Sequence, residues 1–228
     1  MRPVGEPATA GDFLGRLSGA AAAEFERLGA HRTFPAGATL FVEGDPADEA
    51  YVLLAGAVKI SVGSADGREI VLDVFEPRCL LGELSLIDGR PRSATLSTLT
   101  PVEVLVLGAT PFNQFLDQHP EALRQLLIEV IDRLRVRVRH QMEFGTGDAL
   151  GRVCARIVEL GERQPKGPDG VIVVRSPVSQ TDLAAWTGLS REAVVKALRA
   201  LRQLGWIHAQ GRTITISEPE QMRRRAVH

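Results

Sequence analysis

Apolar and polar positions follow two different periods along this chain. From Thr33 to Leu107 the apolar residues alternate with polar ones or gather in short β-branched runs, at Val58–Val62, Ile70–Phe75 and Leu96–Leu107. Glycine and aspartate punctuate these runs, and the Asp-Gly pair at 66–67 fits a hairpin turn. Short strands at this spacing predict a small antiparallel barrel or roll.

From Glu121 onward the apolar spacing becomes three or four residues, which predicts a helix. Its stripe consists of Leu123, Leu127, Val130, Leu134, Val138 and Met142. About 20 residues without a breaker is long for a globular helix, and a narrow stripe is typical of a coiled-coil seam. We therefore predict that residues 119–145 form a dimerisation helix followed by a hinge. Gly145-Thr146-Gly147 is expected to break the helix and to form that hinge. The alternative is a helix packed only on its own barrel.

Shorter elements flank these two regions. A helical segment is expected within Asp12–Leu28, and another helix from Asp148 to Arg163. A Pro/Gly-rich loop at 164–170 then leads to a strand at Val171–Val174. The arginine triplet at 223–225 is expected to be a frayed basic tail.

The stretch from residue 179 to 201 has the pattern of a helix-turn-helix. Ser179 and Asp182 form a capping-box-like start, and a short helix is expected to run to Thr187. Gly188 supplies the turn and Ser190 caps the second helix. Strands at 207–209 and 213–216 are predicted to form the hairpin wing of a winged helix.

The second helix of this motif has two distinct faces. The inward stripe is predicted to be Val194, Ala197, Leu198, Leu201 and Leu204, and the outer face Arg191, Glu192, Val195, Lys196 and Arg199. Such a helix fits the DNA major groove, where Arg reads guanine, Glu accepts from cytosine N4 and Lys reaches guanine or phosphate. Any amphipathic helix has a charged outer face, so the prediction rests on the cap, the glycine turn and the wing together.

Length and charge agree with two domains of different function. The 228 residues suffice for two domains, and the composition is that of a globular protein. Residues 1–147 carry 14 Lys/Arg against 20 Asp/Glu, whereas residues 148–228 carry 13 against 8. The basic C-terminal part is therefore the part expected to meet a polyanion.

Several classes of protein are disfavoured by what the chain lacks. It has no apolar run near the roughly 20 residues of a membrane span, and no signal-peptide core, so no membrane and a cytoplasmic location are expected. Cys79 and Cys154 are expected to be buried small hydrophobes, since an iron–sulfur sensor needs about four thiolates. No catalytic residue, metal site or cofactor is expected.

One segment, Gly82–Thr95, has the sequence GELSLIDGRPRSAT and is called the cassette below. A helical turn starting near Glu83 offers backbone N–H groups to an anion, and Arg92 supplies a planar, charged fork for phosphate oxygens. Ser93 adds a hydroxyl, and Glu83 is placed to accept from a ribose 2′-OH. The alternative is an ordinary strand–turn–strand in which Arg92 pairs with a surface carboxylate. The segment resembles the phosphate-binding cassette of cyclic-nucleotide-binding domains.

Both motifs, in this order and separated by a long helix, resemble the cyclic AMP receptor protein/Crp–Fnr family of bacterial transcription regulators. The resemblance covers about Phe13 to Ile216. It implies an α+β fold with three parts: a cyclic-nucleotide-binding β-roll (12–118), the dimerisation helix and hinge (119–145), and a winged helix-turn-helix (146–228). It also implies a homodimer on palindromic, TGTGA-like DNA sites, with RNA polymerase as a further partner.

The resemblance carries over to individual positions. It implies that the ligand-binding residues are Gly82, Glu83, Leu84, Arg92, Ser93, Arg137 and Val138, and that the DNA-binding residues are Ser179, Thr181, Ser190, Arg191, Glu192, Lys196 and Arg199. The family often has Arg at the position of Lys196, which leaves that base contact less defined.

The long helix departs from the family pattern at one place. Where a Thr-Ser pair reaches the purine from both subunits, this chain has Arg137 and Val138, so the hydroxyl that bonds the adenine edge is absent. Arg137 could stack on the base, donate to a guanine edge or point to solvent. Cyclic AMP is the leading effector and cyclic GMP its competitor.

Two other functions are alternatives to this one. A regulator of the same fold could lack a nucleotide requirement or sense another effector. A nucleotide-regulated enzyme is the other class, but no catalytic domain remains once both motifs are placed, and no phosphate-loop lysine motif or zinc-protease pair is present. Duplex DNA binding with steep salt dependence distinguishes the regulator from the enzyme.

Overall fold

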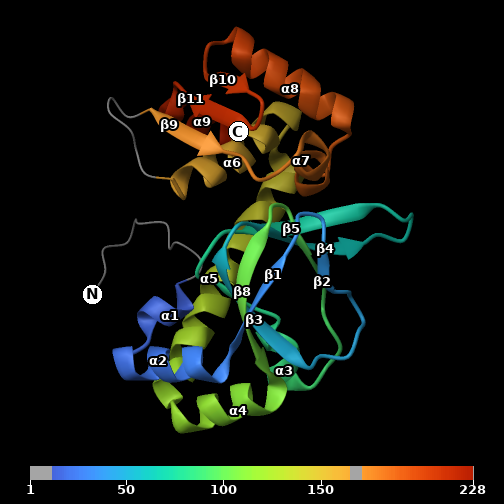
Figure 1. The fold of residues 1–228 in the computed structure, drawn as a ribbon. Helices are drawn as coiled ribbons and strands as arrows, with labels where there is room; N and C mark the ends of the chain where they lie inside the picture. The colour runs from blue at the N-terminus through green and yellow to red at the C-terminus, as the bar shows by residue number, and fades with distance from the viewer. Residues whose placement is uncertain (1–11, 165–170, 228) are drawn as a thin grey trace. The chain divides into compact units, whose positions relative to one another are not determined.

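A computed structural model describes residues 12–164 and 171–227 (Figure 1). The residues fall into two compact units, which we describe separately. The first contains the chain up to Val62 and Asp73–Val136, and the second contains Gly63–Leu72 and the chain from Arg137. The expected N-terminal tail (1–11) and most of the Pro/Gly-rich loop (165–170) lie outside the described residues.

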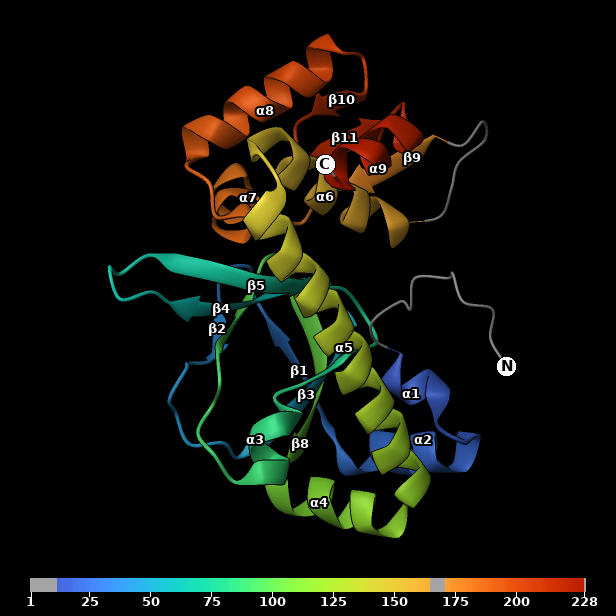
Figure 2. The same cartoon turned by 180° about the vertical axis from the view of Figure 1, so that it is seen from behind.

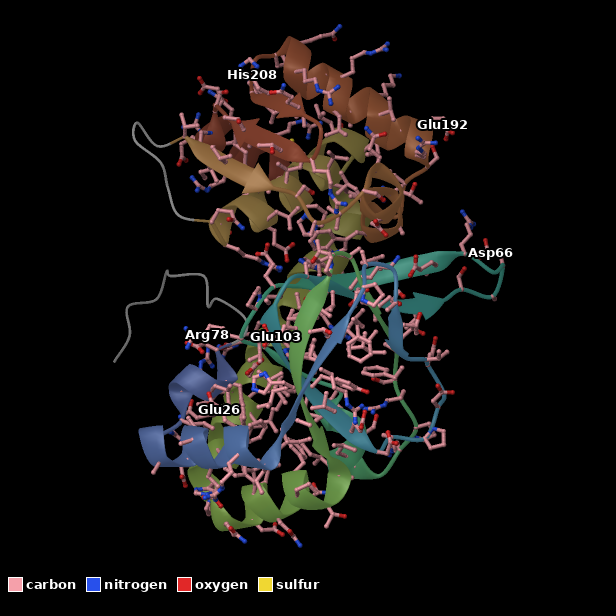
Figure 3. The ribbon with its side chains drawn as sticks, in the orientation of Figure 1. Glu26, Asp66, Arg78, Glu103, Glu192 and His208 are labelled. Atoms are coloured by element: carbon pink, nitrogen blue, oxygen red, sulfur yellow. The ribbon has the colours of Figure 1, made fainter. Side chains whose placement is uncertain are left out.

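The first unit contains most of the predicted antiparallel roll, which is built from two four-stranded sheets. One sheet has the strand order β1-β8-β3-β6 and the other β2-β7-β4-β5. The strands are β1 (Ala30–Phe34), β2 (Thr39–Phe41), β3 (Glu49–Ala55), β4 (Val58–Gly63), β5 (Glu69–Phe75), β6 (Leu80–Leu81), β7 (Thr95–Thr98) and β8 (Val102–Gly108). Gly67, at a positive φ of 77°, turns the β4–β5 hairpin as predicted, and Figure 3 labels Asp66 at its tip.

Strand β3 separates two apolar cores because its successive side chains point to opposite faces. Tyr51 and Leu53 belong to the core that includes Phe75, Leu81 and Leu96. Ala50 and Val52 belong to the other core, whose helical members are Phe13, Phe25, Phe112, Phe115 and Leu126. The helices that cover this side of the roll are α1 (Phe13–Arg16), α2 (Gly19–Leu28), α4 (Ala109–Gln118) and the first turns of α5 (Pro120–Thr146), as Figure 2 shows.

Helix α5 differs from the predicted long helix in two respects. It continues through Gly145 and Thr146, so Gly147 alone breaks it, because a glycine inside a helix costs only about 1 kcal/mol. Val130 is not part of an exposed stripe, since it packs against the roll's core, and Ile131 takes its place. Among the α5 side chains that the structure describes, the large exposed apolar ones are Leu123, Leu127, Ile131, Leu134 and Val138. The side chain of Met142, the last member of the predicted stripe, lies outside the described ones.

The second unit contains the predicted winged helix-turn-helix. Its helices are α6 (Ala149–Glu162), α7 (Gln180–Thr187), α8 (Arg191–Gln203) and α9 (Pro219–Val227). Its sheet has the order β10-β11-β9, with β9 (Ile172–Arg175), β10 (Ile207–Gln210) and β11 (Thr213–Ile216) all antiparallel. Two sequence-based predictions were wrong here. Leu204 is 54% exposed because it lies just past the end of α8, and the arginine triplet belongs to α9.

Helix α9 packs on α6 rather than fraying. Met222 is fully buried, with its sulfur 3.7 Å from the Cys154 thiol. Arg225 pairs with Asp148, which caps the N-terminus of α6 by accepting from Gly151 N at 2.8 Å. These contacts hold the end of the chain against the start of the domain. In the described part of the chain, no helix combines the length and the hydrophobicity that crossing a membrane requires.

A buried polar cluster joins the last turns of α5 to α6. Glu159 accepts from Arg156 at 2.9 Å and from Arg163 at 2.8 Å, and His140 Nε2 lies 3.2 Å from its carboxylate. The Arg156 guanidinium also contacts His140 and lies over the Trp186 ring of α7. Burial alone would raise the pKa of Glu159, but His140 and the two arginines hold it well below its usual range. The carboxylate is therefore charged at neutral pH.

Candidate functional site

The cassette begins at a glycine that no other residue replaces without strain. Gly82 has a φ of 78° and is the N-cap of α3 (Glu83–Asp88). A Cβ at this position would lie 2.8 Å from Nη1 of Arg92 and 3.2 Å from the Phe41 ring. The left-handed backbone and the close approach of the guanidinium both require glycine. In the Gly-Glu pair that the sequence singled out, Gly82 is therefore required by the backbone conformation, and Glu83 is the first residue of α3.

Arg92 is held inside the roll rather than at its surface. It is 3% exposed, and its guanidinium donates to the carbonyl oxygens of Gly82, at 2.8 Å, and Glu49, at 2.6 Å. Its Cζ atom lies 4.2 Å from the centre of the Phe41 ring, and an oxygen of the exposed Asp48 carboxylate is 3.9 Å from Nη2. Burial lowers the pKa of Arg92, but a guanidinium stays charged in a protein. Its strong bonds thus go to main-chain carbonyls, and the surface carboxylate is a distant third partner.

Glu83 is the second buried charge of the cassette. The residue is 1% exposed, and its carboxylate accepts a hydrogen bond from Nη1 of Arg133 at 2.9 Å. Arg133 belongs to α5 and also donates to Glu129 at 2.5 Å and to the carbonyl of Leu80. Burial raises the pKa of Glu129, which lies fully inside. Sequence reasoning missed this triad, although Glu129 and Arg133 have the i, i+4 spacing of a helical ion pair.

The remaining predicted ligand residues are exposed. Leu84 and Ser93 lie on the same cassette, and Leu84 is 45% exposed on α3. Arg137 and Val138 are exposed on α5 and belong to the second unit. Cassette residues Gly82, Glu83 and Arg92 are therefore brought together, whereas the participation of Arg137 and Val138 in a ligand site stays a prediction.

The helix-turn-helix is capped as its sequence predicted. Ser179 accepts from the backbone N–H of Asp182 at 3.1 Å, and the Asp182 carboxylate accepts from the Ser179 N–H at 3.1 Å. Gly188 ends α7 in the left-handed conformation, and Ser190 accepts from Ala193 N at 3.2 Å to start α8. Thr181 is exposed in the first turn of α7.

The outer face of α8 gathers the predicted base-reading residues in one place. Its exposed residues Arg191, Glu192, Val195, Lys196 and Arg199 together line a single open hollow. Figure 3 shows the Glu192 side chain at the N-terminal end of α8, directed away from the domain. Hydrogen bonds from its own backbone N–H and from Ser190 lower the pKa of Glu192. It is thus a charged acceptor at neutral pH, next to three cations.

Two known protein families match the two motifs. The family described as "Cyclic nucleotide-binding domain" matches residues 31–119, and "Crp-like helix-turn-helix domain" matches residues 151–225. A CRP-like cAMP-activated global transcriptional regulator of Mycobacterium tuberculosis is 34% identical over 193 residues, which cover 85% of this chain and 86% of the relative. The chain belongs to the Crp/Fnr family of transcription regulators.

Two solved structures share the fold of this chain. The c-di-GMP responsive global regulator CLP of Xanthomonas campestris has a TM-score of 0.75 and 25% identity, over 88% of this chain and 100% of its own. FixK2 of Bradyrhizobium japonicum has a TM-score of 0.78 over 86% of this chain and 96% of its own, and its 20% identity shows the fold alone. The predictions of an α+β fold, of a DNA-binding transcription regulator with a cyclic-nucleotide-binding domain, and of a protein that is not an enzyme are confirmed.

Proposed function

We propose that this Crp/Fnr regulator is a homodimer whose affinity for palindromic DNA is set by a cyclic nucleotide, with cyclic AMP as the effector. The single observation that carries the proposal is the buried arrangement of Arg92 beside Gly82, with Glu83 one residue further on. The M. tuberculosis relative, named as cAMP-activated, supports the choice of nucleotide. We assign the roll at 12–118 to the ligand, 119–145 to dimerisation and the hinge, and 146–228 to DNA.

In this proposal the effector phosphate meets the Arg92 guanidinium and Ser93, and the ribose 2′-OH meets Glu83. Leu84, Arg137 and Val138 complete the site from α3 and α5. Arg92 already donates to two carbonyls, so the phosphate takes its remaining donors, including Nε, which is buried without a partner. Glu83 of α3 forms a buried ion pair with Arg133 of α5, so a ribose bound at Glu83 would perturb a contact of α5. A ligand shifts the protein only by its differential affinity for the DNA-competent arrangement.

The homodimer is supported by the exposed apolar stripe of α5. Its residues, Leu127, Ile131, Leu134 and Val138, are spaced four, three and four apart, as in a heptad seam. Large exposed apolar residues in such a row mark an interaction surface. A second copy of the chain is the partner whose stripe has the same spacing.

On DNA, the two copies of α8 would occupy successive major grooves of a palindromic site with TGTGA-like halves. Arg191, Glu192 and Lys196 are the proposed base readers, and Ser179, Thr181, Ser190 and Arg199 hold the backbone or neighbouring bases. The regulator acts in the cytoplasm, with RNA polymerase as a further partner.

Calorimetric titration of the purified protein with cyclic AMP and, separately, cyclic GMP tests the effector. We expect saturable binding of cyclic AMP, one molecule per chain, and a lower affinity for cyclic GMP. A higher affinity for cyclic GMP would show that cyclic GMP, not cyclic AMP, is the effector. It would also favour a base contact by Arg137, which offers donors to a guanine edge where the family pattern has a hydroxyl. Binding of neither, with c-di-GMP titrated in parallel, would contradict the proposed switch.

Replacing Glu192 with alanine is expected to relax the choice of base at one position of each half-site. A carboxylate accepts from cytosine N4, and its loss removes about 1–3 kcal/mol of discrimination there. The measurement is competitive binding to operators that differ by one base pair. Glu220→Ala, which removes an exposed glutamate from α9, is the matched control and should leave selection unchanged. A uniform weakening on all sequences would show that Glu192 reads no base.

A further inference from the structure

Val195 is an apolar residue on the otherwise charged, exposed face of α8. It is 38% exposed in the middle of α8, whereas Val194 and Leu198 are buried in the domain core. Its neighbours along the exposed face, Glu192 and Arg199, are charged. A β-branched residue is a poor helix former at an exposed position, so helix propensity does not account for it. Core packing does not account for it either, because Val194 already fills the inward position.

From this position we infer that Val195 is a specificity residue that contacts the C5-methyl group of a thymine in each half-site. The inference rests on the proposed function, since it needs α8 in the major groove. The thymine methyl is the one apolar group that base pairs present in that groove, and small apolar side chains are its partners. A valine suits this contact because its χ1 is nearly fixed in a helix, so little freedom is lost on binding.

The position of Val195 among the charged readers decides which kind of base pair it meets. Glu192 is three residues before it and Arg199 four residues after it, so all three lie on one face. At about 1.5 Å per residue, Val195 is some 4.5 Å further along the helix axis than Glu192. It would therefore meet a base pair next to the one that Glu192 reads. There it would favour T·A over C·G, which lacks the methyl.

The test removes the methyl group from the DNA without changing any hydrogen bond. Operators are first selected from random duplexes with the full-length, effector-loaded protein, and each thymine is then replaced in turn by deoxyuridine. We expect one thymine per half-site at which the wild-type protein loses about three- to tenfold in affinity. Val195→Ala removes two methyl groups from this contact, so it should lose less affinity than wild type on deoxyuridine substitution at that thymine and should select operators with a weaker preference for it.

The matched control is Val173→Ala, which shortens another exposed valine, on β9. It should retain the wild-type response to deoxyuridine. Equal responses of wild type and Val195→Ala at every thymine would overturn the inference while leaving the proposed function intact, because operators would still be selected. Failure to select any operator would overturn both.

Discussion

Replacing Arg92 with alanine is expected to abolish measurable binding of cyclic nucleotide and also to lower the free energy of unfolding of the roll. The first effect follows from losing the only buried positive charge within Gly82–Thr95, which is the group proposed to meet the phosphate. The second follows because the carbonyls of Gly82 and Glu49 each lose a hydrogen bond from a charged donor, at about 1.5–3 kcal/mol for each bond. Calorimetry measures the first and denaturant unfolding the second.

Arg92→Lys separates these two effects. Lysine keeps the positive charge but loses the planar fork, so it cannot serve two carbonyls and a phosphate together. We expect a loss of about ten- to a hundredfold in affinity for cyclic AMP with a smaller loss of stability. Arg90→Ala is the matched control, because Arg90 lies on the same loop with its side chain in solvent. If a folded Arg92→Lys protein bound cyclic AMP with wild-type affinity, the guanidinium would not be the group that binds the phosphate.

The sequence located the cassette but not the contacts that hold it. Gly82, Glu83 and Arg92 lie within eleven residues, so their spacing is visible in a single stretch. The partner of Glu83 is Arg133, 50 residues away, and a pairing at that separation depends on how α5 packs on the roll. The carbonyl of Glu49, which Arg92 binds across 43 residues, is a backbone group and leaves no signature in the sequence at all.

The fold was predicted best where periodicity and capping agree. Helix α8 and its cap followed from Ser190 and the spacing of its buried residues. Strand β3 lies within the stretch predicted to form strands but was not singled out, because both of its faces are covered and its sequence EAYVLLA therefore does not alternate. Helix α9 was missed because its arginine triplet suggested solvent. Arg223 instead pairs with Glu162 and Arg225 with Asp148, both in the same domain. Pairings between residues so far apart in the sequence cannot be predicted from hydrophobic periodicity.

Replacing Leu134 with glutamate is expected to convert the proposed dimer into monomers. Leu134 is 60% exposed on α5, in the middle of the stripe from Leu127 to Val138. In a parallel seam the two copies would face each other, so the substitution would bury two like charges in an apolar contact. We expect the dimer dissociation constant to rise by at least about a hundredfold, measured by sedimentation equilibrium. Binding to a palindromic operator should fall with it, because a monomer engages only one half-site.

Leu204→Glu provides the control, since Leu204 is similarly exposed but follows α8 and is not part of α5. It should leave the dimer unchanged. A dimer that persists in Leu134→Glu would show that the stripe faces this chain's own domains or another partner. Because Glu83 binds Arg133, the residue next to Leu134, the monomer also tests how ligand and dimer are linked. If the two are coupled through α5, cyclic AMP should restore part of the dimer. With one ligand per chain, saturating ligand should lower the dimer dissociation constant by the square of the factor by which dimerisation raises the affinity of each chain for ligand.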